Sequence, residues 1–228
     1  MNIIQGETMF KKMIDTLKGL TRSASPFDPS QLGDPIALQT AWSPAKSGGA
    51  NFRTHKLVET NRGRMEFRPS IFAYLFYSIF FLIGLGLVIG FSVSQFSSGE
   101  FSFKMETVMP MLIGVVFAAV GGAMLYFGTK PIVFDGHKKF FWKGRVNPDH
   151  VANRSTIKDF ASFKDIHALQ LISEYCRGNK SSYYSYELNL VLQNGSRINV
   201  VDHGSRSKLR ADAEKLASFL GKPVWDAT

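Results

Sequence analysis

The sequence lacks charge over two long stretches. No Asp, Glu, Lys or Arg occurs between Arg68 and Glu100, or between Glu106 and Lys130. Each interval holds an apolar run of about 20 residues, the length that a helix needs to cross the hydrocarbon core of a bilayer. A soluble helix of this length normally keeps a polar stripe, and neither run has one. We therefore predict two transmembrane helices, at about 71–91 and 108–127.

The sequence also has little that points to catalysis or to a cofactor. Its five histidines are scattered, and none has a His or Cys partner at metal-ligand spacing. The glycines near 84–90 lie inside an apolar run, so they do not form a phosphate-binding loop. The single cysteine, Cys176, has no partner for an intrachain disulfide, which favours a cytoplasmic location. We expect a non-enzymatic protein with no catalytic residue, metal or cofactor.

Positive charge is abundant, and it gathers outside the pair of runs. The loop between the runs carries Lys104 against Glu100 and Glu106. Lys and Arg are retained on the cytoplasmic side of a membrane, so both termini should be cytoplasmic. The net charge of +9 then reflects topology and attraction to anionic lipid; no nucleic-acid motif accompanies it, and we expect no nucleic-acid partner. The flanking residues are Arg53, Lys56, Arg62, Arg64, Arg68, Lys130, Lys138, Lys139, Lys143 and Arg145.

Small residues recur at four-residue spacing in both runs. Gly86 and Gly90 lie in the first, and Gly114, Ala118 and Gly122 lie in the second. This spacing lets helix backbones approach closely in lipid. It fits packing of the two spans against each other, or homo-oligomerisation through the same faces.

Three segments precede the first span. Residues 1–20 have the pattern of an amphipathic helix that lies on the membrane or docks on protein. Residues 21–50 are rich in Ser, Pro and Gly and indicate a linker, in which Trp42 is either an anchor for a partner or a contact with the chain's own domain. Residues 51–69 indicate a β-hairpin that leads into the two spans within 70–129. Since a lone hairpin is marginal in water, it should pair with the C-terminal sheet or with its copy in another chain.

Residues 130–228 indicate a β-rich domain that ends in one helix. The pattern predicts strands at 131–135, 139–145, 163–174, 186–193 and 196–203, with a loop at 176–182. Asn194-Gly195 between two alternating runs is a strong hairpin signal. A helix should begin at Ser205 or Ser207 and end near Leu220, where Gly221 can cap it.

Three short pieces of this domain carry a resemblance to a known architecture. They are Val133-Phe134-Asp135 with the aromatic strand after it, Phe163-Lys164-Asp165-Ile166, and the pattern from Ala213 to Pro223. Their order resembles that of bacterial two-span inner-membrane proteins with a cytoplasmic pleckstrin-homology-like (PH-like) domain, and it is similar to the two-span photosystem I assembly factor of chloroplasts and cyanobacteria. The resemblance implies an α+β membrane protein, with a transmembrane helical hairpin and a PH-like antiparallel β-barrel or sheet closed by a C-terminal helix.

Two groups of side chains are candidates for function. Lys138, Lys139, Lys143 and Arg145 are predicted to lie on the first hairpin of the domain, where they either bind lipid headgroups or serve topology alone. Trp42, Tyr183 and Tyr184 are candidate contacts for a partner. The leading hypothesis is a scaffold or assembly factor whose domain binds a protein partner or a second copy. The alternative is a lipid- or ligand-responsive regulator that binds anionic headgroups.

Overall fold

The computed structural model describes residues 27–61, 63–99, 104–177 and 181–228. The amphipathic helix expected over 1–20 lies outside these residues.

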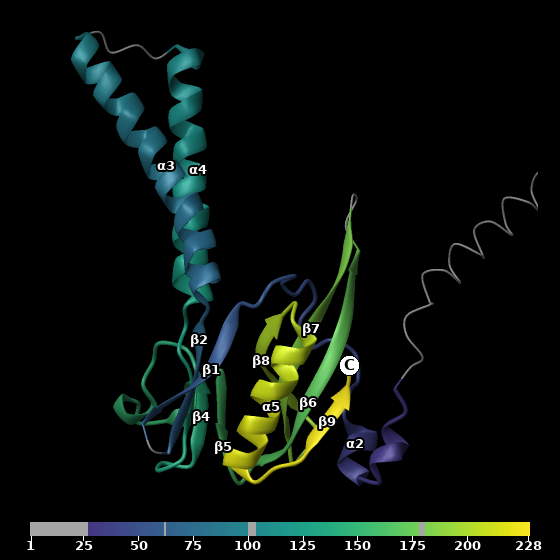
Figure 1. Cartoon of the computed structure of the whole chain (residues 1–228). Coiled ribbons are helices and arrows are strands. Elements are labelled where there is room, and N and C mark those ends of the chain that lie inside the picture. The colour runs from purple at the N-terminus through teal and green to yellow at the C-terminus, as the bar shows by residue number, and fades with distance from the viewer. Residues whose placement is uncertain (1–26, 62, 100–103, 178–180) are drawn as a thin grey trace, which may run out of the picture.

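Two long antiparallel helices form one end of the molecule (Figure 1). They are α3 (Ile71–Ser98) and α4 (Met105–Gly128), and both are long and apolar enough to cross a membrane. Most of their apolar side chains are exposed, among them Ile71, Leu82 and Val116. Helix α3 is longer than the predicted span because its Ser-rich end stays helical, with the Ser92 hydroxyl donating to the Val88 carbonyl.

The first sheet joins strands from both sides of the helical hairpin. Its order is β1-β2-β3-β4-β5, all antiparallel. The hairpin expected at 51–69 is β1–β2, and β2 pairs with β3, so it completes the sheet of its own chain. The strands are β1 (His55–Asn61), β2 (Arg64–Pro69), β3 (Ile132–Asp135), β4 (Phe140–Lys143) and β5 (Asp159–Ser162).

The second sheet has the order β8-β7-β6-β9, antiparallel except for the parallel pair β6–β9. Asn194-Gly195 forms the turn between β7 and β8, as predicted, and Gly195 has the positive φ of 76° that such a turn requires. The strands are β6 (Ile166–Arg177), β7 (Ser182–Leu192), β8 (Arg197–His203) and β9 (Val224–Ala227).

Helix α5 (Arg206–Leu220) packs across the two sheets and ends at Gly221, as the sequence predicted. Leu209, Ala213 and Leu216 bury its apolar face in a core shared by both sheets. The described strands form two separate sheets and do not close a barrel, so the barrel form of the expected domain is wrong. The mixed α+β class, with two long apolar helices and largely antiparallel sheets, is confirmed.

Residues 27–50 lie against the second sheet. Two short helices, η1 (Pro29–Leu32) and α2 (Pro35–Gln39), pack with Trp42 on its outer face, around Ala37 and Trp225. The sequence indicated a linker without a core here, because its apolar residues are too widely spaced to show a period. We call residues 41–54, which continue along β7 and β8 to β1, the strap. The remaining short helices, η2 (Pro148–His150) and η3 (Arg154–Thr156), lie between β4 and β5.

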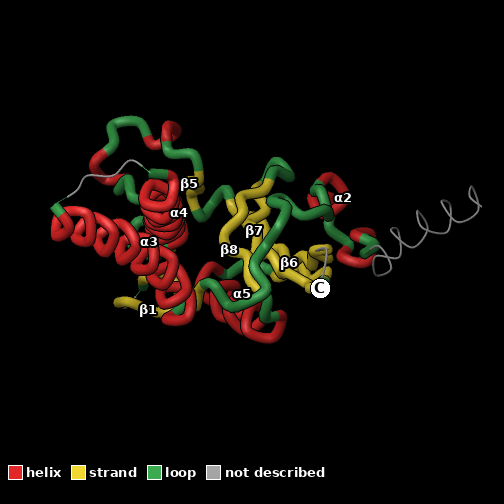
Figure 2. Tube along the Cα trace, turned by 90° about the horizontal axis from the view of Figure 1, so that it is seen from above, coloured by secondary structure: helices red, strands yellow, loops and turns green. Residues whose placement is uncertain are grey.

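The helical hairpin stands over one side of the domain. Viewed from above, α3 and α4 lie beside β1 and β5, while β6 and β7 lie to the other side (Figure 2). The rings of Phe72 and Phe76 pack against Phe52 of the strap at 5.2 and 5.7 Å between centroids. The domain is therefore held directly beneath the ends of the two helices.

Candidate functional site

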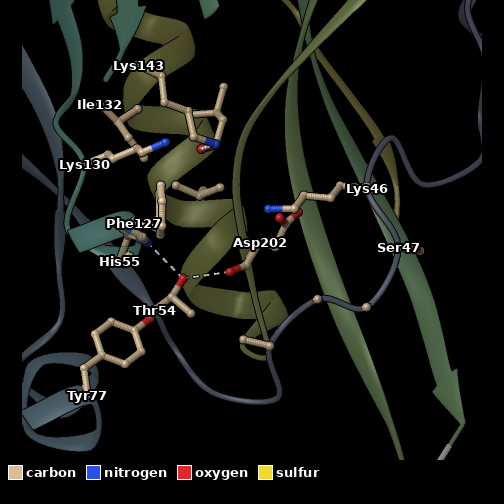
Figure 3. A pocket seen from close by; sticks show the side chains of 16 residues that line it. Lys46, Ser47, Thr54, His55, Tyr77, Phe127, Lys130, Ile132, Lys143 and Asp202 are labelled. Atoms are coloured by element: carbon tan, nitrogen blue, oxygen red, sulfur yellow. Dashed lines mark hydrogen bonds between the residues drawn. The ribbon is translucent and has the colours of Figure 1, made fainter. Parts of the chain in front are cut away.

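A cleft of about 230 Å³ lies where the two long helices meet the domain (Figure 3). This is below the roughly 300–1,000 Å³ of drug-sized ligand sites, so the cleft suits a small polar group. Its walls come from α3, α4, the segment that joins α4 to β3, the strands β1, β3, β4 and β8, and the strap. The lining residues with chemistry to offer are Lys46, Thr54, His55, Lys130, Lys143 and Asp202.

Lys143 supplies a fixed charge to the cleft. Its Nζ donates to the Val200 carbonyl at 2.9 Å and to the carbonyl and side-chain oxygens of Asn199 at 3.1 and 3.3 Å. Three acceptors match the three protons of an ammonium group. Burial lowers the pKa of Lys143, and the charge of Asp202 opposes that shift.

Lys46 and Lys130 supply charge that a ligand could reach. Lys46 enters from the strap, and Lys130 lies near Lys143 on the opposite wall (Figure 3). The Lys130 ammonium lies 4.9 Å from the centre of the Phe127 ring. Among the described residues, no carboxylate oxygen lies within 4.0 Å of the Nζ of Lys46, Lys130 or Lys143. Three cations therefore converge with one carboxylate, Asp202, between them.

The strap that carries Lys46 is held by two carboxylates and one backbone carbonyl. Glu187 accepts from the backbone N–H groups of Ala45 and Lys46 at 2.8 and 2.9 Å. Glu174 accepts from the N–H of Gly48 at 3.0 Å, and the Thr54 hydroxyl donates to the Asp202 carbonyl at 2.7 Å. These bonds fix the strap, and with it one wall of the cleft.

The titratable groups of the cleft are shifted by burial. Burial, with the charges of Lys143 and His203, lowers the pKa of His55 to about 4. Burial raises the pKa of Asp202 to about 6, against the hydrogen bond from Asn199. Since the Thr54 hydroxyl proton goes to the Asp202 carbonyl, His55 Nδ1 is the donor in its 3.0 Å contact with Thr54. His55 is thus neutral at pH 7 and leaves the positive charge to the lysines.

No family model, curated protein or solved structure matches the chain. We therefore infer function from the geometry of the cleft. The described residues hold no group of three or more His, Cys, Asp or Glu side chains that could bind a metal ion.

The four basic residues predicted to form one patch lie apart. Lys138 and Lys139 lie in the turn between β3 and β4, at the end of that hairpin away from α4. Lys138 forms an ion pair with Asp149 of η2. Lys143 faces the cleft. Arg145 donates to the Tyr126 carbonyl at 3.0 Å and stacks on the Tyr126 ring, which joins β4 to the end of α4.

The three aromatic candidates have different surroundings. The Trp42 Nε1 donates to the Ala37 carbonyl, and its ring packs 5.8 Å from Trp225, so Trp42 contacts its own domain. The Tyr183 hydroxyl donates to the Gly49 carbonyl of the strap at 2.9 Å. Tyr184 is exposed and packs beside Tyr175.

Some of the small residues of the long helices lie between α3 and α4, and others do not. Gly114, Ala118 and Gly122 of α4 face α3, whereas Gly86 and Gly90 have no atom within 4 Å of an added Cβ. The tightest contacts involve Gly84 and Gly121, which the four-residue spacing did not single out. A Cβ on Gly84 would lie 2.1 Å from the Ala118 backbone nitrogen. The signal that could have found Gly84 is its seven-residue distance from Tyr77, which shares its helix face.

Acid should destabilise the domain through its buried histidines. His203 is fully buried, and burial with the charge of Arg53 lowers its pKa to about 4. Its Nδ1 accepts from the Ser205 N–H, so protonation there would break a hydrogen bond. Between pH 6.5 and 4 the unfolded chain binds protons on His55 and His203 that the folded chain does not. The free energy of unfolding therefore decreases as the pH is lowered. The raised pKa of Asp202 has the opposite effect on stability, but the two histidines together outweigh this one carboxyl group.

We therefore expect the detergent-solubilised chain to have a lower melting temperature at pH 4.5 than at pH 7. The free energy of unfolding should fall by on the order of a few kcal/mol, since one pKa unit corresponds to about 1.4 kcal/mol. Far-UV circular dichroism measures it. His203→Gln can still accept from Ser205 and does not titrate, so it should remove part of this pH dependence. Equal pH dependence in parent and variant would contradict the role of His203.

Proposed function

We propose that the chain is a two-span protein of the bacterial inner membrane whose cytoplasmic domain binds an anionic, phosphate-bearing group in the cleft beneath the spans. In this function it acts as a lipid- or ligand-responsive regulator. The observation that carries the proposal is the convergence of Lys46, Lys130 and Lys143 without a carboxylate at ion-pair distance among the described residues.

The position of the cleft supports a lipid headgroup as the ligand. Tyr77 of α3 and Phe127 and Gly128 of α4 form its wall on the side of the helices. The ends of two apolar helices mark the level at which headgroups lie. A positive charge near an anionic leaflet contributes about 1 kcal/mol.

The scaffold function predicted from the sequence ranks second. Of its three candidate partner contacts, Trp42 and Tyr183 are occupied by contacts within the chain. It stays a prediction, and the PH-like character of the domain stays with it.

Native mass spectrometry of the full chain in mild detergent tests the proposal with two added lipids. We expect phosphatidylglycerol to bind in preference to phosphatidylcholine, and inorganic phosphate to compete if free phosphate is the true ligand. Lys46→Gln with Lys130→Gln removes two charges, which corresponds to about a 30-fold loss of affinity at about 1 kcal/mol per charge.

The matched control is Lys138→Gln with Lys139→Gln. It makes the same change of charge in the turn of the β3–β4 hairpin far from the cleft, and it should leave binding unchanged. Equal losses in the two double variants, or no preference for the anionic lipid, would sink the proposal.

A further inference from the structure

The two long strands of the second sheet extend beyond their neighbours. Strand β8 ends at His203, opposite Tyr186, and β9 ends at Ala227, opposite Ile172. Residues 174–177 and 182–185 therefore pair only with each other, through Glu174–Ser185, Tyr175–Tyr184, Cys176–Tyr183 and Arg177–Ser182. We call this two-stranded extension the arm. The sequence indicated a loop at 176–182, so the end of the arm was not predicted as strand.

The arm rises on the same side of the domain as α3 and α4 (Figure 1). Where β8 ends, the Gly204 N–H donates to the Phe52 carbonyl at 3.0 Å, and Phe52 packs on the first turns of α3. That level is the start of the apolar helix. From Tyr186 to Ser182 the arm continues about 13 Å further at about 3.3 Å per residue. It therefore reaches the height of the first turns of α3.

The two faces of the arm differ. The strap covers one face, where Glu174, Tyr183 and Ser185 bond to residues 48–50. The other face carries Tyr175 and Tyr184, which are 53% and 47% exposed with ring centroids 5.1 Å apart. Arg177, also exposed, lies at the end of the same face.

This face has the chemistry of the membrane–water interface. Tyrosine is enriched there because its ring is apolar and its hydroxyl remains hydrated. Arginine beside it can contact lipid phosphates. A two-stranded extension without neighbouring strands is marginally stable in water, so a contact that buries its aromatic face would stabilise it.

We propose that the Tyr175–Tyr184 face of the arm inserts into the headgroup region of the bilayer that α3 and α4 cross, as a second membrane contact beside the spans. The inference rests on the proposed membrane topology. This contact fixes the tilt of the domain relative to the bilayer, and so holds the mouth of the cleft at the lipid surface.

Spin labels on the full chain in liposomes of phosphatidylethanolamine and phosphatidylglycerol test this inference. The background is Cys176→Ser, and the labels are placed at Tyr184→Cys, at Asn194→Cys and at Val116→Cys. Asn194 is the matched control because it lies in the exposed turn at the other end of β7, and Val116 is an exposed residue of α4. Collision with oxygen and with a water-soluble nickel chelate reports depth in the membrane.

We expect the label at 184 to collide with the nickel chelate several-fold less than the label at 194, and to lie at a depth between 194 and 116. Equal values at 184 and 194, with 116 in lipid, would overturn the arm contact and leave the proposed function intact. An aqueous label at 116 would overturn the topology and with it both proposals. Shielding of 184 from both reagents would mean burial against protein, such as a second copy, and would also overturn the lipid contact. Tyr175→Cys repeats the measurement if the label at 184 disturbs folding.

Discussion

Gly84→Leu should separate the two long helices, whereas Gly86→Leu should not. A Cβ on Gly84 would lie 2.1 Å from the Ala118 nitrogen and 2.6 Å from the Gly114 carbonyl oxygen. Both are backbone atoms of α4, so the whole helix must move. An added Cβ on Gly86 meets nothing within 4 Å. The two substitutions are chemically identical and lie two residues apart, which makes Gly86→Leu a matched control.

The expected cost of Gly84→Leu is about 1–3 kcal/mol or more, as for overpacking of a filled interior. Titration of the chain from dodecyl maltoside into sodium dodecyl sulfate, followed by circular dichroism, measures it. Gly121→Leu should behave like Gly84→Leu, because its Cβ would lie 2.3 Å from the Phe81 nitrogen. Equal stabilities of the variants at 84 and 86 would contradict the packing. A change in particle mass for Gly86→Leu would instead favour the predicted homo-oligomer, through the face that Gly86 and Gly90 leave open.

Glu187→Ala should release the strap from the second sheet. The Glu187 carboxylate is 1% exposed and accepts four hydrogen bonds. The donors are the backbone N–H groups of Ala45 and Lys46 and the side-chain amides of Asn189 and Asn199. Removing the acceptor leaves several of these donors unpaired in a site that water reaches poorly. A buried donor left without a partner costs about 1–3 kcal/mol, so losing several hydrogen bonds together should lower the free energy of unfolding by several kcal/mol.

Amide hydrogen exchange over residues 45–50 should become faster, which would show that the strap is released. The midpoint of thermal unfolding should fall, which would show the loss of overall stability. Glu187→Gln keeps the shape and one acceptor oxygen, so its effect should be intermediate. Glu214→Ala is the control, since Glu214 lies on the exposed face of α5. Because Lys46 is held through its own N–H, Glu187→Ala should also weaken binding of anionic lipid. Unchanged protection of the Ala45 and Lys46 amides would show that Glu187 does not hold the strap.

Elements with a strong local pattern were predicted from the sequence, although α3 and β7 extend beyond their predicted bounds. The two apolar helices follow from long runs without charge, and the β7–β8 hairpin follows from Asn194-Gly195 between alternating residues. Helix α5 follows from its apolar stripe and Gly221. In each case the decisive residues lie within one element, so hydropathy and turn geometry are enough.

The candidate site depended on which segments meet. Lys46, Lys130 and Lys143 come from the strap, the segment after α4 and β4, and no local pattern joins them. Glu187 lies on the polar face of an alternating strand, which the period of two marks as outward but does not mark as covered. The strap covers that face and turns Glu187 into a buried acceptor. Likewise the four-residue spacing of glycines indicated close packing, but the crossing of α3 and α4 decided that Gly84, rather than Gly86, lies in it.

The sequence by itself determined two apolar helices, the β-hairpin before them and a β-rich domain closed by one helix, because burial and backbone geometry leave periodic traces in a single segment. The tertiary structure decided that the sheets stay open, that the strap seals one of them, and that three lysines share one cleft beneath the helices. Those features arise from contacts between residues far apart in the chain, and their free energies are set by packing that no single segment encodes.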